Sequence, residues 1–151
     1  KAMAMRPSYD ILKTLVKEHE REGKKNGKGF YDYPDKGDKH LWPKLTELYP
    51  TSSEQPSQQD LVDRLMFIQA NESAKCFEEN VVRSVADTNI GSIFGWGFAP
   101  NQGGTLQFIN SMGVERFVAR SRELAKQYGE RFEPAKILVD MAASGEEFVD
   151  G

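Results

Sequence analysis

The sequence is poor in the residues that build disulfides and metal sites. One cysteine and two histidines occur among 151 residues, and a disulfide or a cysteine metal cluster needs more than one thiol. Neither His19 nor His40 has a partner at metal-ligand spacing. We therefore expect no bound metal and no internal disulfide, and we interpret Cys76 as a small core or boundary residue in a reducing compartment.

Long apolar runs are also missing. No stretch approaches the roughly 20 apolar residues that cross a bilayer, and residues 1–7 lack the apolar segment of a signal peptide. Basic residues are mixed with acidic ones and the formal net charge is −3, whereas a nucleic-acid module carries a basic stripe. These features predict that the chain has no transmembrane segment and that it binds no nucleic acid.

Motifs for catalysis and nucleotide binding are incomplete. Residues 95–97 begin like a Gly-x-Gly-x-x-Gly dinucleotide fingerprint, but Pro100 stands where the third glycine belongs, and a helical pattern precedes it. Ser92 and Ser111 have no histidine near them in the sequence, so a catalytic triad is unsupported. We predict no catalytic, cofactor-binding or metal-binding residue in this chain.

What the sequence does contain is an uncharged, glycine-rich stretch at residues 91–104. It holds five of the 13 glycines and Trp96, one of the two tryptophans, between helical patterns rich in charged residues. Flexible linkers favour polar residues over apolar ones, so we expect a shaped and largely buried turn between helices. Two interpretations remain at this point: the turn lines a site, or it is a tight junction between helices.

Helical periodicity dominates the rest of the chain. Residues 114–128 carry the cleanest apolar stripe, which Gly129 terminates. Ser57 is a candidate cap for a long helix at 58–79, and alternating strand patterns of convincing length are missing. We therefore predict an all-α fold. The expected helices are at 8–21, 58–79, 81–93, 105–112 and 114–128, and the last one runs from Pro134 to Gly145.

The chain shows signs of two parts. Residues 34–59 are rich in proline, glycine and polar residues, which indicates a connector. Near each end of the chain, a proline leads into a Leu/Val-striped helix, then glycine, then an aromatic segment. We predict that residues 1–50 are the end of one helical unit with its connector, that 51–55 are a linker, and that 56–151 are a second unit.

Several short motifs follow one another in a recognisable order: 27–33, 63–66, 72–82, 86–91, 95–98 with 103–104, and 132–145. This order resembles 3-hydroxyacyl-CoA dehydrogenases, and above all the C-terminal region of the multifunctional α subunit of fatty-acid β-oxidation. The resemblance covers nearly the whole chain. It implies a helical C-terminal domain of the 6-phosphogluconate dehydrogenase-like type, in which 1–50 end the first repeat and 56–151 form the second.

The resemblance also implies an activity for a parent protein. Members of this family oxidise 3-hydroxyacyl-CoA to 3-ketoacyl-CoA with NAD, and some also carry an enoyl-CoA hydratase. Their Rossmann domain binds NAD and holds a His–Glu catalytic pair, so this chain alone is expected to be inactive. Expected partners are the acyl-CoA substrate, that Rossmann domain, the first helical repeat and a thiolase subunit. The implied location is cytoplasmic in a bacterium, and mitochondrial or peroxisomal in a eukaryote.

Individual residues can be carried over from the family. Asp63 stands where the first repeat has a functional Asn, so the resemblance implies a catalytically silent repeat. Phe94 stands where the family has an acyl-CoA-contacting Tyr just before Gly-x-Gly-Phe, and Ala99 interrupts the usual Gly-Phe-Pro. Phe94 and Trp96 are therefore the candidate substrate-binding residues. The alternatives are a stand-alone helical assembly module without substrate contact, and an independent lipid carrier.

Overall fold

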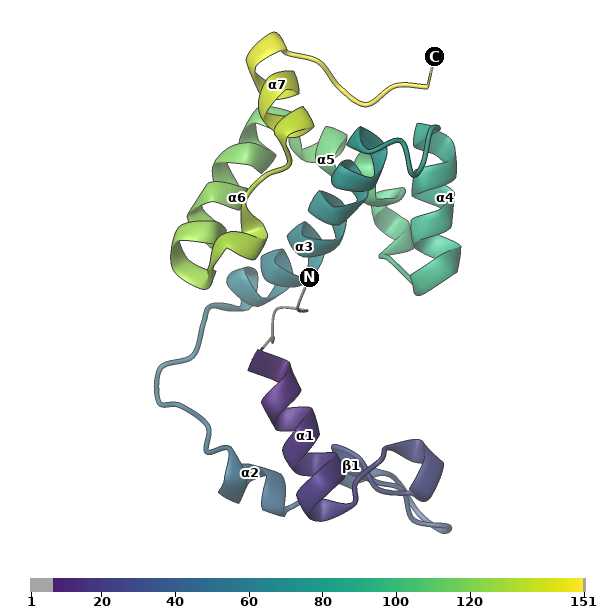
Figure 1. Ribbon diagram of the computed structural model, residues 1–151, viewed down its shortest axis with the longest axis vertical. Coiled ribbons are helices and arrows are strands. Elements are labelled where there is room, and N and C mark those ends of the chain that lie inside the picture. The colour runs from purple at the N-terminus through teal and green to yellow at the C-terminus, as the bar shows by residue number, and fades with distance from the viewer. Residues whose placement is uncertain (1–6, 151) are drawn as a thin grey trace. The chain divides into compact units, whose positions relative to one another are not determined.

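A computed structural model describes residues 7–150 of the chain (Figure 1). Within these residues lie seven α-helices and one two-stranded antiparallel ribbon. The chain divides between Gln55 and Pro56 into two compact units, which are described separately here. The prediction about a signal peptide concerns residues 1–7, and residues 1–6 lie outside the described part of the chain.

Unit 1 is a helix followed by a small ribbon. It contains α1 (Pro7–His19), a 3-10 turn at Lys24–Asn26, β1 (Tyr31–Asp32), β2 (His40–Leu41) and α2 (Lys44–Leu48). The strands pair Tyr31 with Leu41 and Asp32 with His40. A mostly helical chain is confirmed, but the strictly all-α prediction is wrong for this ribbon. Two-residue strands are too short to show an alternating pattern in the sequence.

A buried arginine holds the ribbon to the end of α1. The Arg21 Nε atom donates to the Gly29 carbonyl at 2.6 Å, and its guanidinium pairs with Asp32 at 2.5 Å. The guanidinium also lies 4.2 Å from the centre of the Trp42 ring, a cation–π contact. Burying an arginine is costly unless its donors are satisfied. These contacts therefore fix the course of the chain from the helix into the ribbon.

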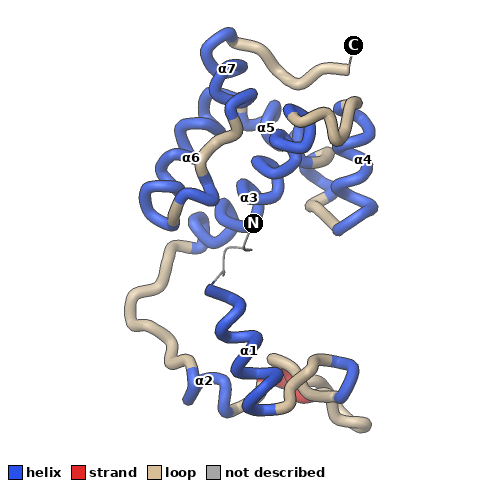
Figure 2. The backbone as a smooth tube through the Cα atoms, viewed as in Figure 1, coloured by secondary structure: helices blue, strands red, loops and turns tan. Residues whose placement is uncertain are grey.

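Unit 2 contains five helices joined mainly by short loops (Figure 2). The helices are α3 (Gln58–Glu78), α4 (Val85–Trp96), α5 (Thr105–Met112), α6 (Val114–Tyr128) and α7 (Lys136–Ser144), with 3-10 turns at Pro100–Gln102 and Glu130–Phe132. The predicted bounds of α5 and α6 are confirmed. The start of α4 was predicted too early: Ser84 caps this helix by accepting a hydrogen bond from the Asp87 N–H, so helical structure begins at Val85.

The core of unit 2 is centred on aromatic side chains from α3, α5 and α6. Phe67 stacks on Phe117 with ring centres 4.3 Å apart, and Phe108 meets both rings edge-on. The stripe predicted for α6 faces this core. On α3 the buried face includes Phe67, whereas Leu65 is 66% exposed. Helix α3 carries apolar residues on several faces, so periodicity alone did not reveal the buried face.

The glycine-rich stretch differs from the prediction of a largely buried turn. Its first six residues are the last part of α4, and much of their surface is exposed. Gly97 ends the helix in the left-handed conformation with φ +78°. Beyond it, Phe98 is buried, and the 3-10 turn leads into α5. The turn is therefore confined to residues 97–104, since the glycines at 91 and 95 are helical.

Candidate functional site

An apolar groove with a volume of about 500 Å³ lies between α3 and α4 in unit 2. Its walls come from the C-terminal half of α3, from the segment that follows α3, and from one face of α4. The residues that line it are Ile68, Gln69, Glu72, Ser73, Cys76, Val81, Val82, Asp87, Thr88, Gly91, Gly95 and Trp96. A volume of this size and an apolar lining are typical of ligand and helix-docking sites.

Trp96 is the candidate substrate-binding residue that the structure places at this groove. Its ring is 56% exposed, and its Nε1–H donates to the Gln69 side-chain oxygen at 3.0 Å. This hydrogen bond satisfies the one polar atom of the indole and ties the end of α4 to α3. The other candidate, Phe94, is 86% exposed and is not among the lining residues. The two rings are therefore not brought together in one site.

The charged residues that line the groove are both acidic, and one of them is paired with a lysine just outside it. Glu72 and Asp87 are the charged side chains among the described residues that line it. Lys75 does not line the groove, although its ammonium group lies 2.8 Å from the Glu72 carboxylate. Acidic groups with no basic lining residue disfavour a phosphate-bearing ligand and favour a neutral or cationic one.

Side chains of α4 hold the start of α5 in place. The Asn89 Oδ1 atom accepts hydrogen bonds from the N–H groups of Leu106 and Gln107, at 2.9 and 3.1 Å. The buried Ser92 hydroxyl donates to the Asn89 carbonyl and accepts from the Thr105 N–H. These groups satisfy helix N–H donors that have no partner within the helix. Ser92 therefore has a structural role and is not placed to act as a nucleophile.

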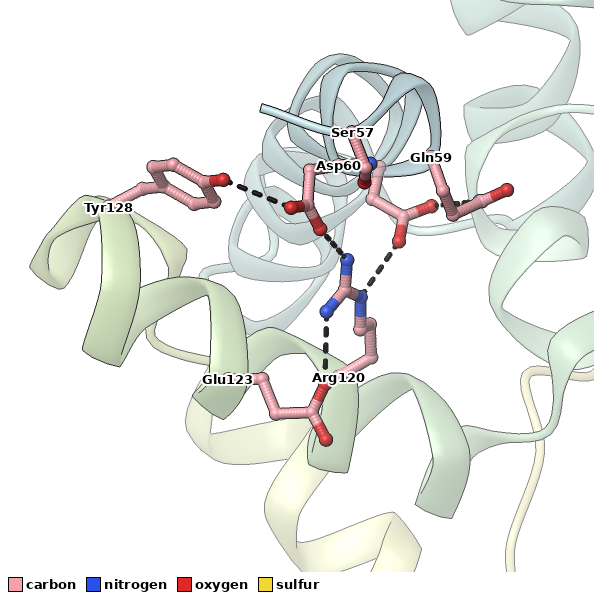
Figure 3. A network of polar contacts seen from close by, with 7 residues as sticks. Ser57, Gln59, Asp60, Arg120, Glu123 and Tyr128 are labelled. Atoms are coloured by element: carbon pink, nitrogen blue, oxygen red, sulfur yellow. Dashed lines mark hydrogen bonds and ion pairs between the residues drawn. The ribbon is translucent and has the colours of Figure 1, made fainter. Parts of the chain in front are cut away.

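A second polar cluster joins α3 to α6, and the sequence did not reveal it (Figure 3). Arg120 donates to Asp63 at 2.7 Å, to Asp60 at 2.5 Å and to Glu123 at 3.0 Å. The Tyr128 hydroxyl donates to Asp60 at 3.1 Å. Partners about 60 positions apart in the sequence leave no local pattern, so a distinctive signal for this cluster was lacking.

The cluster changes the acidity of its members. The hydrogen bond from Arg120 lowers the pKa of Asp60; burial opposes this shift, and the hydrogen bond from Tyr128 adds to it. Burial and the hydrogen bond to Asp60 raise the pKa of Tyr128. Desolvation disfavours the charge on Arg120, but its carboxylate partners outweigh this effect and raise its pKa. The arginine therefore stays charged and bridges the two helices.

Asp63 is fully engaged within this cluster. It is buried, its Oδ2 atom accepts from Arg120, and its Oδ1 atom accepts from the Gln59 amide at 2.7 Å. Both oxygens of this buried carboxylate therefore serve the contact between α3 and α6 and the first turns of α3. The two histidines lie in unit 1: His19 is the last residue of α1, and His40 is exposed, 3.7 Å from the Asp32 carboxylate.

The glycines at residues 95 and 97 do not fit the phosphate-binding turn of an NAD site. Dinucleotide pyrophosphate sits at the N-terminus of a helix that follows a strand. Gly95 and Gly97 lie instead at the C-terminal end of α4, where the helix dipole is negative and the terminal groups are carbonyls.

Across residues 7–150, no three His, Cys, Asp or Glu side chains are grouped so that they could hold a metal ion. In the same part of the chain, no helix is both long enough and apolar enough to cross a bilayer. No known protein-family model matches this chain.

Proposed function

We propose that this chain is a non-catalytic helical C-terminal part of an NAD-dependent 3-hydroxyacyl-CoA dehydrogenase of fatty-acid β-oxidation. Its role is to pack against a preceding helical repeat and to complete an apolar edge of the acyl-CoA cleft. In this proposal, unit 1 with its connector ends the first repeat, and unit 2 is a second repeat of the 6-phosphogluconate dehydrogenase-like type. NAD and the His–Glu pair belong to the Rossmann domain of the parent protein.

The order of the family-like motifs carries this proposal, and the contacts of Asp63 support it. Where the first repeat of the family has a functional Asn, this chain has the Asp63 carboxylate, which is bonded to Arg120 and Gln59. Such a residue stabilises the α3–α6 contact, and a carboxylate cannot offer the N–H donor of an Asn amide. A repeat without the functional Asn is suited to a structural role and not to a catalytic one.

The residues that line the groove favour contact with one part of the acyl-CoA substrate over the other. An acyl chain is neutral and fits an apolar wall such as that of Trp96. The phosphates of coenzyme A do not suit a border that carries Glu72 and Asp87. We therefore propose contact with the acyl portion through Trp96, with Phe94 as a second apolar contact outside the groove.

The coding sequence upstream of Lys1 provides the decisive test. We expect it to encode a strand, a Gly-x-Gly-x-x-Gly turn and a helix, followed by the start of a first helical repeat. An upstream sequence without this fingerprint would overturn the proposal. A turnover assay with acetoacetyl-CoA and NADH tests the non-catalytic role, because measurable activity of the purified 151-residue chain contradicts it.

A second candidate function is a helical assembly module without substrate contact. The exposure of Phe94, Ile90 and Leu65 favours it, because all three are large apolar side chains facing solvent. Titration calorimetry with a long-chain acyl-CoA separates the candidates. Binding that weakens in Trp96→Ala supports the dehydrogenase proposal, whereas no measurable heat, together with self-association, supports the assembly module.

A further inference from the structure

The segment that follows α7 crosses unit 2 towards the start of α4 (Figure 1). Its residue Phe148 is buried and meets the Phe77 ring of α3 edge-on, with ring centres 5.6 Å apart. The Phe148 N–H donates to the side chain of Asn110 on α5 at 3.0 Å, and its carbonyl accepts from the same side chain at 2.7 Å. Phe148 therefore attaches the middle of this segment to α3 and α5.

Asp150 attaches the same segment to α4. Its carboxylate accepts from the N–H groups of Val85 and Ala86, at 2.7 and 2.9 Å, and from the Ser84 hydroxyl at 3.3 Å. The first N–H groups of a helix have no partner within the helix, and a negative charge there is favoured by the helix dipole. The start of α4 is thus joined to α3 and α5 through Phe148 and Asp150.

The rest of the segment is loosely held. Residues 146–150 form neither helix nor strand, and the side chains of residues 146, 147 and 149 are exposed. A cavity of about 480 Å³ borders the segment, and it is lined by Phe77, Ile137, Met141, Glu146, Glu147, Phe148 and Val149. Segments with few buried apolar contacts open at the lowest free energies. Residues 146–150 are therefore expected to detach before the helices of unit 2 unfold.

The start of α4 is also a wall of the α3–α4 groove. Asp87 and Thr88 line the groove from the first turns of α4, and Cys76 lines it from α3. Cys76 directly precedes Phe77, whose ring packs on Phe148. Helix α4 packs mainly on α5 and leaves the groove between itself and α3. The attachments of the segment therefore lie beside the end of the groove that contains Cys76.

We propose that residues 146–150 are a strap that controls access to this end of the α3–α4 groove. With the strap bound, Asp150 holds the first turn of α4 close to α3. When the strap detaches, this turn loses its cap and moves away from α3, and the groove widens beside Cys76. The hydrogen bond from Trp96 to Gln69 retains the other end of α4. This inference does not rest on the proposed function, since it concerns a motion within unit 2.

The Cys76 thiol provides the test, because it is the one cysteine of the chain and lines the groove. It is partly exposed, so a bulky maleimide dye should react faster when the groove is wide. In the 151-residue chain, Asp150→Ala should raise the labelling rate about fivefold, as expected for the loss of one cap. Glu147→Ala makes the same charge change at an exposed position of the strap and should leave the rate within about twofold.

A variant on α5 tests the strap from outside it. Asn110→Leu removes both hydrogen bonds to Phe148 and should also raise the labelling rate by about fivefold or more. Release of the strap exposes little surface, so the labelling rate should rise less steeply with urea than global unfolding followed by circular dichroism. An unchanged rate in Asp150→Ala or in Asn110→Leu, an equal rise in Glu147→Ala, or a urea slope equal to that of global unfolding would each overturn the proposal.

Discussion

Gly104 lies so close to Asn89 that a Cβ atom on the glycine would sit 2.4 Å from the Asn89 Cβ and 2.5 Å from its Cα. This approach brings the N-terminus of α5 against the side of α4. It also puts the Asn89 amide oxygen within reach of the N–H groups of Leu106 and Gln107. One glycine and one asparagine therefore define how the end of the glycine-rich stretch turns.

We expect Gly104→Ala to destabilise the protein strongly. Its φ of +107° and ψ of 174° belong to a region nearly restricted to glycine, which costs another residue about 1–3 kcal/mol, and the clash with Asn89 adds to this. Gly129→Ala is a matched control, with φ +103°, ψ 165° and nothing within 4 Å of an added Cβ. In urea unfolding Gly104→Ala should lose about 1–3 kcal/mol more than the control. Equal losses would refute a role for close approach.

Replacing Arg120 by methionine should loosen the contact between α3 and α6. The change leaves the largely buried Asp63 carboxylate without its cationic partner, at a cost of about 2–4 kcal/mol. Glu123→Gln is the control, because Glu123 is exposed and its pair with Arg120 is worth less than about 1 kcal/mol. Chemical denaturation measures both, and similar losses for the two variants would contradict this ranking.

Asp60 should make stability depend on pH. Its pKa is lower in the folded than in the unfolded protein, where the ordinary value is 3.8. The stabilisation is therefore complete above that unfolded value and is lost as the pH falls through the folded pKa. The difference in urea midpoint between wild type and Asp60→Asn should be largest near pH 6 and should shrink below about pH 4. In an Arg120→Met background this pH dependence should be much weaker; an unchanged dependence there would contradict the assigned cause.

The first turn of α4 depends on a side chain from the C-terminal segment. The Asp150 carboxylate accepts from the N–H groups of Val85 and Ala86, at 2.7 and 2.9 Å. Removing this cap with Asp150→Ala should cost about 1 kcal/mol and speed amide hydrogen exchange at the start of α4. Glu147→Ala removes one acidic charge from the same segment at an exposed position and should have little effect. Identical exchange in the two variants would exclude capping by Asp150.

The two aromatic candidates should behave differently in the intact parent enzyme. Trp96→Ala removes a groove wall and should raise the acyl-CoA KM about fivefold, equivalent to roughly 1 kcal/mol of apolar contact. Phe94→Ala should have a smaller effect, because this ring lies outside the groove, and it should leave stability within about 0.5 kcal/mol. If the KM is unchanged in both folded variants, residues 91–104 have a structural role and do not contact the substrate.

Only part of the candidate site was predictable from the sequence. Trp96 was named as a candidate, and it lines the groove, but the continuation of α4 beyond Ile93 through Gly95 to Trp96 was not predicted. Glycine clusters usually mark turns, so a composition argument places a turn where α4 in fact continues. The Arg120 cluster was missed because its carboxylate partners on α3 lie far away in the sequence.

Local patterns in the sequence by themselves determined a mostly helical chain, the bounds of α5 and α6, and the cap that Ser57 provides for α3. These features depend on neighbours within about one helical turn, which periodicity and capping rules describe well. Only the tertiary structure decided which face of α3 is buried, which distant side chains bind the first turns of α4 and α5, and where a groove opens. Each of these outcomes depends on groups brought together from distant positions, and no short-range pattern encodes such contacts.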